Sequence, residues 1–335
     1  MSKTVIPVSY KSVLNLYETQ TAIGLTKRCF EDKLSAALNL KRVSAPLFVD
    51  PQTGLNDNLN GSERAVSFDI LETKTVAEVV HSLAKWKRMA LKKYDFRPGK
   101  GLYTDMNAIR RDEELSNIHS IYVDQWDWEK VITNEDRTEK YLKDTVNAIV
   151  GAVCDTLDTL KARYPQITTE IKREVSFVTS QELLDLYPGM TGKERENAYL
   201  KEHKTAFIMK IGDKLSNGEP HDSRAPDYDD WELNGDIMFW NDLLGRAFEI
   251  SSMGIRVDEK SLDRQLTAAG CDNRRALPFH KMLLNSELPL TMGGGIGQSR
   301  LSMLILGKAH IGEVQVSLWD DDTVKTCSDA GIILL

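Results

Sequence analysis

The sequence predicts an α+β fold in which a mainly antiparallel sheet is flanked by helices. Candidate strands follow one another without the regular helical crossovers that a doubly wound parallel sheet requires. Residues 119–129 (HSIYVDQWDWE) alternate as a strand does, and apolar residues between 142 and 160 recur every three or four positions, as on one face of a long helix. No repeat, low-complexity tract or Pro/Gly/Ser-rich linker interrupts the chain, so we expect one domain over residues 1–335.

Local patterns place the individual elements along the chain. Helical spacing of apolar residues predicts helices at 19–38, at 82–94 with Ser82 as the N-cap, at 142–160, between 179 and 205, and after Arg300. Alternating or clustered apolar residues predict strands at 40–46, 65–70, 77–81, 119–129, 174–179, 205–212, 235–241, 246–257 and 313–319. Strands 235–241 and 246–257 are close enough in sequence to be antiparallel neighbours.

Composition excludes several classes of function. The net charge of −7 leaves no broad basic surface for nucleic acid, so phosphate chemistry would need a local basic site. The four cysteines are far apart and form no C-x-x-C pair, which argues against zinc or a redox couple. Without a signal peptide or a long apolar stretch, we expect a cytoplasmic protein that does not associate with membranes.

The segment LTMGGGIGQSR (290–300) invites comparison with the known glycine loops that bind phosphate. It is not G-x-G-x-x-G, because Gln298 or Arg300 falls where the last glycine belongs, and it lacks the lysine of a P-loop. What remains is a glycine run that delivers Arg300 to the start of a helix. From this segment alone, a phosphate site and an ordinary turn before a helix are equally good interpretations.

Acidic residues on the late strands are candidate metal ligands. If strands 235–241 and 246–257 pair, Asp236 and Glu249 could face one cleft and bind Mg²⁺ through carboxylate oxygens. Period-two alternation places Glu249 on the same face as Ser251. Two acids on adjacent strands are more often solvated, and the charged loop HDSRAPDYDDW (221–231) could equally be an exposed surface loop.

The stretch IRRDEELSNIHSIYVDQWDWE (109–129) has an arginine pair and acids in a short loop, followed by a strand. Alternation predicts Gln125, Asp127 and Glu129 on one face of this strand and the two tryptophans on the other. Arginine suits the bidentate binding of phosphate or carboxylate. A surface hairpin would explain the charges but not the interleaved tryptophans.

These segments resemble the three motifs of class II aminoacyl-tRNA synthetases: LKRVSAPLF with Pro46, IRRDEELSNIHSIYVDQWDWE and GGGIGQSRLSMLIL. The chain is more closely similar to one family of that superfamily, aspartate-ammonia ligase, through TGLNDNLNGSERAV, VVHSLAKWKR, GLYTDMNAIR, HSIYVDQWDWE, SQELL, RAPDYDDW, LNGDI and FEISSMGIRVD. The resemblance runs from about residue 10 to the C-terminus and implies a class II synthetase-like antiparallel sheet flanked by helices. One departure is that only Glu232 separates RAPDYDDW from LNGDI, where bacterial relatives have a longer loop.

The resemblance implies ATP-dependent synthesis of L-asparagine from L-aspartate and ammonia through β-aspartyl-AMP, with release of AMP and pyrophosphate. Arg110 would contact the α-phosphate and the aspartyl carboxylate, with Arg111 as the alternative. Arg300 would contact the ATP phosphates, and Glu249 with Asp236 would bind Mg²⁺. Ser252 would lie near the bound aspartate or adenylate.

The resemblance also implies how aspartate is recognised. Lys87 is the candidate cation for the α-carboxylate, and Ser82 is a further contact. Asp57, Gln125 and Asp127 are candidates for the ammonium group and the reacting end; the loop residues that would close over ATP are Arg224 and Asp229. Without the resemblance, Asp57, Ser82 and Lys87 would be read as ordinary surface.

Free ammonia is the expected nitrogen donor, because glutamine hydrolysis needs an activated cysteine and residue 2 is serine. An acid such as Asp57 or Asp127 would receive the proton. One rival is an aspartyl- or asparaginyl-tRNA synthetase, which needs an anticodon-binding domain before the first motif, where this chain has about forty residues. Another is an inactive sensor, which should lack a metal-binding acid or a motif arginine. We expect a homodimer, since the first motif forms dimers in the superfamily, and no nucleic-acid partner.

Overall fold

The computed structural model describes residues 4–57, 59 and 63–335. Within them, an eight-stranded sheet has the strand order β1-β5-β6-β11-β10-β9-β8-β7 and is antiparallel except at its edges, where β1 pairs with β5 and β7 with β8 in parallel. The strands are β1 (Leu40–Arg42), β5 (Gly101–Ile109), β6 (Tyr122–Val131), β7 (Ser176–Thr179), β8 (Thr205–Met209), β9 (Asp229–Asn241), β10 (Arg246–Arg256) and β11 (Thr291–Gly297). The predicted α+β class is confirmed, as is the antiparallel pairing of the strands around 235–241 and 246–257.

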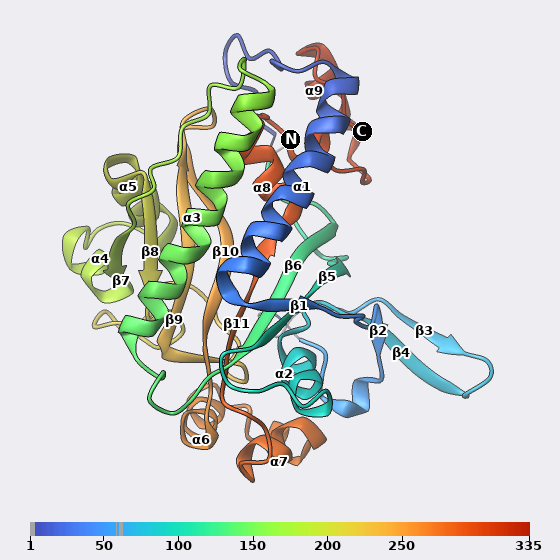
Figure 1. Ribbon diagram of the computed structural model, residues 1–335, viewed down its shortest axis with the longest axis vertical. Helices are drawn as coiled ribbons and strands as arrows, with labels where there is room; N and C mark the ends of the chain where they lie inside the picture. Colours follow the sequence, from blue (N-terminus) through green and yellow to red (C-terminus); the bar gives the residue numbers. More distant parts are fainter. Residues whose placement is uncertain (1–3, 58, 60–62) are drawn as a thin grey trace.

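Two long helices, α1 (Leu16–Leu38) and α3 (Glu139–Arg163), lie side by side along the sheet (Figure 1). The buried aromatic face of β6 contributes to this core, since Trp126 and Trp128 are fully buried and the Phe30 ring lies 4.8 Å from that of Trp126. The predicted division of β6 into an aromatic and an acidic face is therefore confirmed.

Helix α1 starts before the predicted residue 19 because Asn15 and Glu18 form a capping box.

Shorter elements surround the sheet. A three-stranded sheet of β2 (Phe48–Val49), β4 (Thr75–Val79) and β3 (Ser67–Ile70) extends away from it (Figure 1). The remaining helices are α2 (Ala84–Lys93), α4 (Ser180–Leu186), α5 (Gly192–His203), α6 (Glu259–Ala268), α7 (Pro278–Leu284), α8 (Gln298–Ile305) and α9 (Asp321–Asp329), with 3₁₀ turns η1 (Pro51–Thr53), η2 (Asp272–Ala276) and η3 (Ile311–Glu313). In the described ranges, no helix combines the length and apolar character needed to span a bilayer.

Three local predictions are corrected. Residues 313–319 form no strand: Val316 and Leu318 are exposed, and Gln315 turns inward to bond Asp124, so the alternation reflects an irregular segment after η3. The N-cap of α2 is Leu83, not Ser82, although the Ser82 hydroxyl accepts the Ala84 N–H at 3.1 Å. The predicted strand 40–46 ends at Arg42.

The short connection at Glu232 is part of a strand. Strand β9 runs from Asp229 to Asn241, so the last three residues of RAPDYDDW and all of LNGDI belong to one strand. The pairing with β10 is irregular around Glu232, because Asn234 pairs with Gly254 and Asp229 pairs with Arg256, which leaves four residues of β9 opposite one of β10.

A buried histidine near the C-terminus predicts acid sensitivity. The His310 Nδ1 atom accepts the Gly312 N–H at 3.1 Å, and burial lowers the pKa of His310 to about 4. Because the unfolded chain has the higher pKa, about 6.5, it binds more protons than the folded chain between these values, and stability falls as pH drops from about 6.5 towards 4. We expect urea unfolding at pH 7.5, 6 and 5 to show a shallower pH dependence for His310→Asn than for wild type. Parallel pH profiles for the two proteins would contradict this assignment.

Candidate active site

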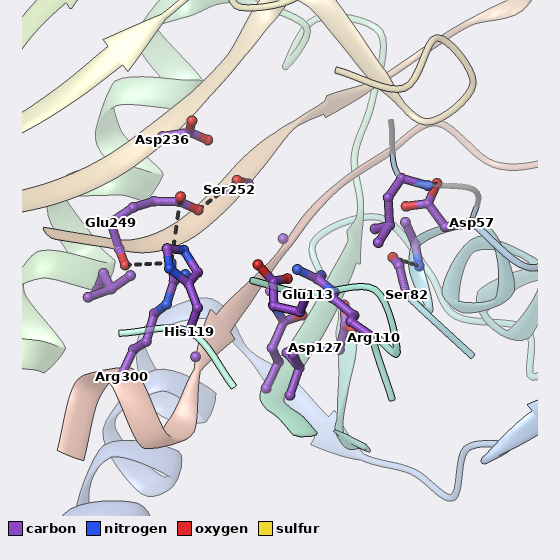
Figure 2. A pocket seen from close by; sticks show the side chains of 18 of the residues that line it. Asp57, Ser82, Arg110, Glu113, His119, Asp127, Asp236, Glu249, Ser252 and Arg300 are labelled. Atoms are coloured by element: carbon purple, nitrogen blue, oxygen red, sulfur yellow. Dashed lines mark hydrogen bonds and ion pairs between the residues drawn. The ribbon is translucent and has the colours of Figure 1, made fainter. Parts of the chain in front are cut away.

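A cavity of about 520 Å³ lies on the acidic face of β6, opposite the two tryptophans. It brings together every predicted site residue: Asp57, Ser82, Lys87, Arg110, Gln125, Asp127, Arg224, Asp229, Asp236, Glu249, Ser252 and Arg300. Figure 2 shows Asp236, Glu249, Ser252 and Arg300 at one end, Asp57 and Ser82 at the other, and Arg110 and Asp127 between them. Residues from distant stretches of the sequence thus converge on one site.

The floor of the cavity is a row of paired residues across four central strands. Asp127 on β6 pairs with Gly295 on β11, Gly295 pairs with Ser252 on β10, and Ser252 pairs with Asp236 on β9. Glycine is required at position 293, because a Cβ atom there would overlap the buried Glu129 carboxylate and the Trp128 carbonyl oxygen, whereas a Cβ at position 295 would meet only the Gln125 side chain. The glycine run is therefore a central strand that leaves space for polar side chains, and not a loop.

The glycines should differ in their tolerance of alanine. A Cβ at Gly294 would lie 2.6 Å from the Met253 Cβ and 2.9 Å from the Ser252 carbonyl oxygen, whereas at Gly295 it meets only atoms of the movable Gln125 side chain. We expect Gly294→Ala to lower the free energy of unfolding by about 1–3 kcal/mol, and Gly295→Ala to lower it by less than about 1 kcal/mol. Urea denaturation measures both, and equal losses would contradict this distinction.

A β-bulge determines which serine faces the cavity. The register of β10 shifts between Glu249 and Ser251 against β9, so two steps of β10 oppose one step of its partner. As a result Ser252, and not Ser251, lies beside Glu249, and its hydroxyl donates to Glu249 Oε1 at 3.1 Å. The predicted sharing of a face by Glu249 and Ser251 is wrong, because a bulge breaks the period of two.

Acids and arginines are paired at the end of the cavity that contains Glu249. Arg224 Nη2 donates to Asp236 Oδ1 at 2.5 Å, and Arg300 Nη1 lies 3.6 Å from Glu249 Oε2. Burial raises the pKa of the Asp236 carboxyl, with Glu249 adding to the effect against the attraction of Arg224. The surrounding protein also disfavours charge on Glu249, but the positive charges of Arg300 and Lys193 outweigh this and hold its pKa well below its usual range.

These two carboxylates are the candidate metal ligands. Within the described ranges, no group of three or more histidine, cysteine or acidic residues could hold a metal ion. Two carboxylates that share a site match Mg²⁺, which proteins commonly bind through one or two carboxylates together with substrate phosphates. The repulsion between Asp236 and Glu249 is what a divalent cation would relieve.

Of the adjacent arginines, Arg110 lines the cavity and Arg111 is exposed. The Arg110 Nε atom is buried and has no hydrogen-bond partner among the described residues, so it is available to an anionic ligand. Arg110 begins the loop between β5 and β6, and its N–H donates to the Ile121 carbonyl at 2.9 Å. The geometry therefore favours the first arginine of the pair.

Lys87 is fully buried beneath the cavity floor. Its ammonium group donates to Asp127 Oδ1, to the Trp128 carbonyl at 3.0 Å and to the Gly294 carbonyl at 3.1 Å. All three of its hydrogens are thus directed at protein oxygens. The contact between Lys87 and the α-carboxylate of the substrate stays a prediction. It would require Lys87 to give up one of these three hydrogen bonds and to make one to the substrate instead.

Two buried carboxylates that line the cavity each keep one oxygen without a hydrogen-bond partner among the described residues: Asp57 Oδ2 and Asp127 Oδ2. Burial raises the pKa of Asp57, opposed by Lys85 and reinforced by Asp227. The other Asp57 oxygen accepts the Leu59 N–H at 3.0 Å, which fixes the carboxylate. These free oxygens can accept a proton or bind an ammonium group.

The predicted role of Arg224 and Asp229 as closing loop residues does not match their positions. Asp229 is the first residue of β9, is buried and pairs with Arg256 Nη1, while Arg224 is held by Asp236. Both line the cavity as fixed parts of its wall.

Other cavity residues escaped the sequence analysis: Glu113, His119, Lys193, Tyr228 and Arg256. Burial lowers the pKa of His119 to about 3, with Arg300 adding to the effect, so its imidazole is neutral near pH 7. The position of His119 within the motif HSIYVDQWDWE could have identified it as a site residue from the sequence. Lys193 lies in α5, where no distinctive local pattern marks it.

Comparison with known proteins gives the family. The chain matches the aspartate-ammonia ligase family over residues 17–331. It is 59% identical to the aspartate–ammonia ligase of Clostridium tetani over 334 aligned residues. This alignment covers 99% of this chain and 98% of the relative. It is 58% identical over 337 residues to that of Ruminiclostridium cellulolyticum, which covers 100% of both chains.

Solved structures share the fold at low sequence identity. The asparaginyl-tRNA synthetase of Pyrococcus horikoshii complexed with asparaginyl-adenylate aligns with a TM-score of 0.66 and 14% identity, covering 90% of this chain and 70% of that one. The Entamoeba histolytica asparaginyl-tRNA synthetase aligns with a TM-score of 0.63 and 13% identity, covering 89% of this chain and 66% of that one. The fold is thus of the class II aminoacyl-tRNA synthetase type, and the family match is much closer. The chain therefore belongs to the aspartate-ammonia ligase family.

Proposed function

We propose that this protein makes L-asparagine from L-aspartate, ammonia and ATP, through a β-aspartyl-AMP intermediate, with release of AMP and pyrophosphate. The observation that carries the proposal is the division of one cavity into two chemically different ends. Arg224, Arg300 and a pair of acids suited to Mg²⁺ lie at one end, Asp57 with a free carboxylate oxygen lies at the other, and Asp127, which also has a free oxygen, lies between them (Figure 2). This arrangement suits a triphosphate at the first end and an amino acid with a nitrogen nucleophile at the second.

In the first half-reaction, an oxygen of the aspartate β-carboxylate attacks the α-phosphorus of ATP, and the bond to the pyrophosphate oxygen breaks. Arg110 lies between the two ends of the cavity, where its guanidinium, with the free Nε as one donor, can bind the α-phosphate and the attacking carboxylate together (Figure 2). Arg300, with Arg224 nearby, would neutralise charge on the leaving pyrophosphate. Such fixed cations lower the barrier because they need no reorganisation as charge develops.

Asp236 and Glu249 would hold Mg²⁺, which when bound neutralises phosphate charge. Ser252 fixes the Glu249 carboxylate by donating a hydrogen bond to it. The two acids also hold Arg224 and Arg300 in place for the phosphates.

In the second half-reaction, ammonia attacks the acyl carbon and the bond to AMP breaks. The nitrogen loses a proton, and Asp57 or Asp127 would accept it through the free Oδ2 atom. The raised pKa of Asp57 favours proton uptake there, while Asp127 is held by Lys87 and suits the α-ammonium group of aspartate. Gln125 and Ser82 would complete the aspartate site.

The test is aspartate-dependent ATP–pyrophosphate exchange with Mg²⁺, followed by product analysis with ammonium and no tRNA. We expect exchange with aspartate but not with asparagine, and stoichiometric AMP and asparagine once ammonium is added. Exchange with asparagine, or transfer of radiolabelled amino acid to tRNA, would favour the aminoacyl-tRNA synthetase alternative. Absence of both exchange and asparagine would refute the proposal.

We also propose a cytoplasmic homodimer in which residues 1–335 act as one catalytic domain that binds no nucleic acid. Leu47 and Phe48, at the end of the segment that resembles the dimer-forming first motif, are 52% and 43% exposed, which supports a partner on this surface. Light scattering should give twice the chain mass of 37.8 kDa.

A further inference from the structure

The helix that carries Arg300 is anchored by a carboxylate from a different element. Asp124 lies on β6 and is 5% exposed. Its Oδ1 accepts the Ser299 N–H at 3.0 Å, and its Oδ2 accepts the Ser299 hydroxyl at 2.8 Å. Both bonds are made to the residue that immediately precedes Arg300.

Two further donors hold Asp124 in place. Lys27, on α1, donates to Oδ2 at 3.0 Å, and Gln315 Nε2 donates to Oδ1 at 3.3 Å. Gln315 Nε2 also contacts the Ser299 hydroxyl oxygen at 3.0 Å. Both carboxylate oxygens are therefore bonded, so the orientation of Asp124 is fixed from three sides.

Helix α8 depends on this carboxylate at its N-terminus. Its own N-cap, Gly297, has no side chain and makes no capping bond. Asp124 bonds the N–H of the second helical residue, which is the bond that a capping side chain would make, and adds negative charge at the positive end of the helix. Glycine at 297 serves a separate purpose, since a Cβ there would lie 3.1 Å from the Arg300 Cβ.

The position of the first turn determines where the Arg300 guanidinium lies. Arg300 Nη1 donates to the Glu249 carbonyl at 3.1 Å, and Nε donates to the Ile118 carbonyl at 3.4 Å. The Arg300 guanidinium can donate to both carbonyls and still face the cavity only if the first turn of α8 is held in this position. An arginine held in this way is preorganised for phosphate, while a displaced one must first be ordered.

We propose that Asp124 is the positioning residue of Arg300: by anchoring Ser299, it holds the guanidinium in the orientation that binds the ATP phosphates. This rests on the proposed function insofar as ATP is the ligand. Lys27 extends the anchor to α1, so the contact also joins the helical layer to the phosphate end of the cavity. Asp124 lines the cavity, but both of its carboxylate oxygens are bonded to protein donors, which suits a positioning role.

The test is a double-mutant cycle on ATP binding, measured by calorimetry with Mg²⁺ for wild type, Asp124→Asn, Arg300→Ala and the double variant. We expect Asp124→Asn to weaken ATP binding about tenfold in wild type and less than about twofold in Arg300→Ala, because coupled residues are not additive. The KM for aspartate in pyrophosphate exchange should stay unchanged. Ser302→Ala, which loses a hydroxyl bond to the Gln298 carbonyl in the same helix without touching Asp124, is the matched control and should bind ATP as wild type does.

An equal loss of ATP affinity in both backgrounds would overturn the proposal, because Asp124 would then act independently of Arg300. An unchanged affinity for Asp124→Asn would also overturn it. If Asp124→Asn does not fold, Ser299→Ala removes the hydroxyl bonds to Asp124 and Gln315 but keeps the backbone N–H bond to Asp124, and it should weaken ATP binding in wild type but not in Arg300→Ala. A wild type that binds ATP but gives no aspartate-dependent exchange would refute the proposed function and leave this cycle decisive for Asp124.

Discussion

Replacing Arg300 by alanine is expected to abolish aspartate-dependent ATP–pyrophosphate exchange while leaving the fold intact. The Arg300 side chain is about one quarter exposed and lies next to Glu249 at the cavity, so its removal opens little buried space. Loss of a preorganised cation that meets charge developing in the transition state typically lowers the rate about 10²- to 10³-fold. Stability should change little, because partly exposed ion pairs contribute only about 0–1 kcal/mol.

The control for this variant is Arg97→Ala, which removes an exposed arginine that pairs with the exposed Asp95. It should exchange at the wild-type rate. Arg300→Lys separates charge from shape, since lysine keeps the cation but not the planar fork, and should retain partial activity. Near-normal exchange by Arg300→Ala, with an unchanged unfolding midpoint, would remove Arg300 from the phosphate site.

Much of the site could be predicted because its residues lie in contiguous motifs with clear alternation. In β6, the period of two separates the two tryptophans from Asp127 and Glu129, and the fold follows this pattern. For the arginine that contacts the α-phosphate, the sequence left two adjacent candidates, Arg110 and Arg111. The direction in which a loop residue points depends on hydrogen bonds such as Arg110 N–H to the Ile121 carbonyl, which no local pattern reveals.

Other features depend on contacts between distant parts of the chain. The bulge in β10 moves Ser252 beside Glu249, but no glycine or proline marks the shift. Lys87 reads as helix surface from sequence, yet its position beneath β6 buries it against Asp127, 40 positions further along the chain. Residues 313–319 alternate like a strand, but Gln315 bonds Asp124 and Ser299 and Ser317 bonds Ser120, so the polar positions of this segment contact side chains instead of a neighbouring strand.

The buried charges beneath the cavity should dominate stability, and Glu129 is central to them. Its carboxylate is fully buried, receives Arg256 Nη2 at 2.8 Å and the Thr291 hydroxyl at 2.7 Å, and lies 3.8 Å from Lys87 Nζ. Burial disfavours its charge, but Arg256 and Lys87 outweigh this and lower its pKa. Glu129 therefore separates two buried cations that would otherwise repel each other.

Glu129→Gln should lower the free energy of unfolding by about 3–5 kcal/mol, because it leaves Lys87 and Arg256 with too little compensating charge away from water. The amide keeps the shape of the side chain, so the loss cannot come from a cavity. Asp144→Asn, which breaks the exposed Lys140–Asp144 pair on α3, is the control and should unfold at the wild-type urea concentration. If Glu129→Gln is too unstable to purify, Thr291→Val, which removes one hydrogen bond to the same carboxylate, should give a smaller loss of the same sign. A wild-type midpoint for Glu129→Gln would mean that Asp127 and Asp229 alone compensate both cations, and the central role assigned to Glu129 would be wrong.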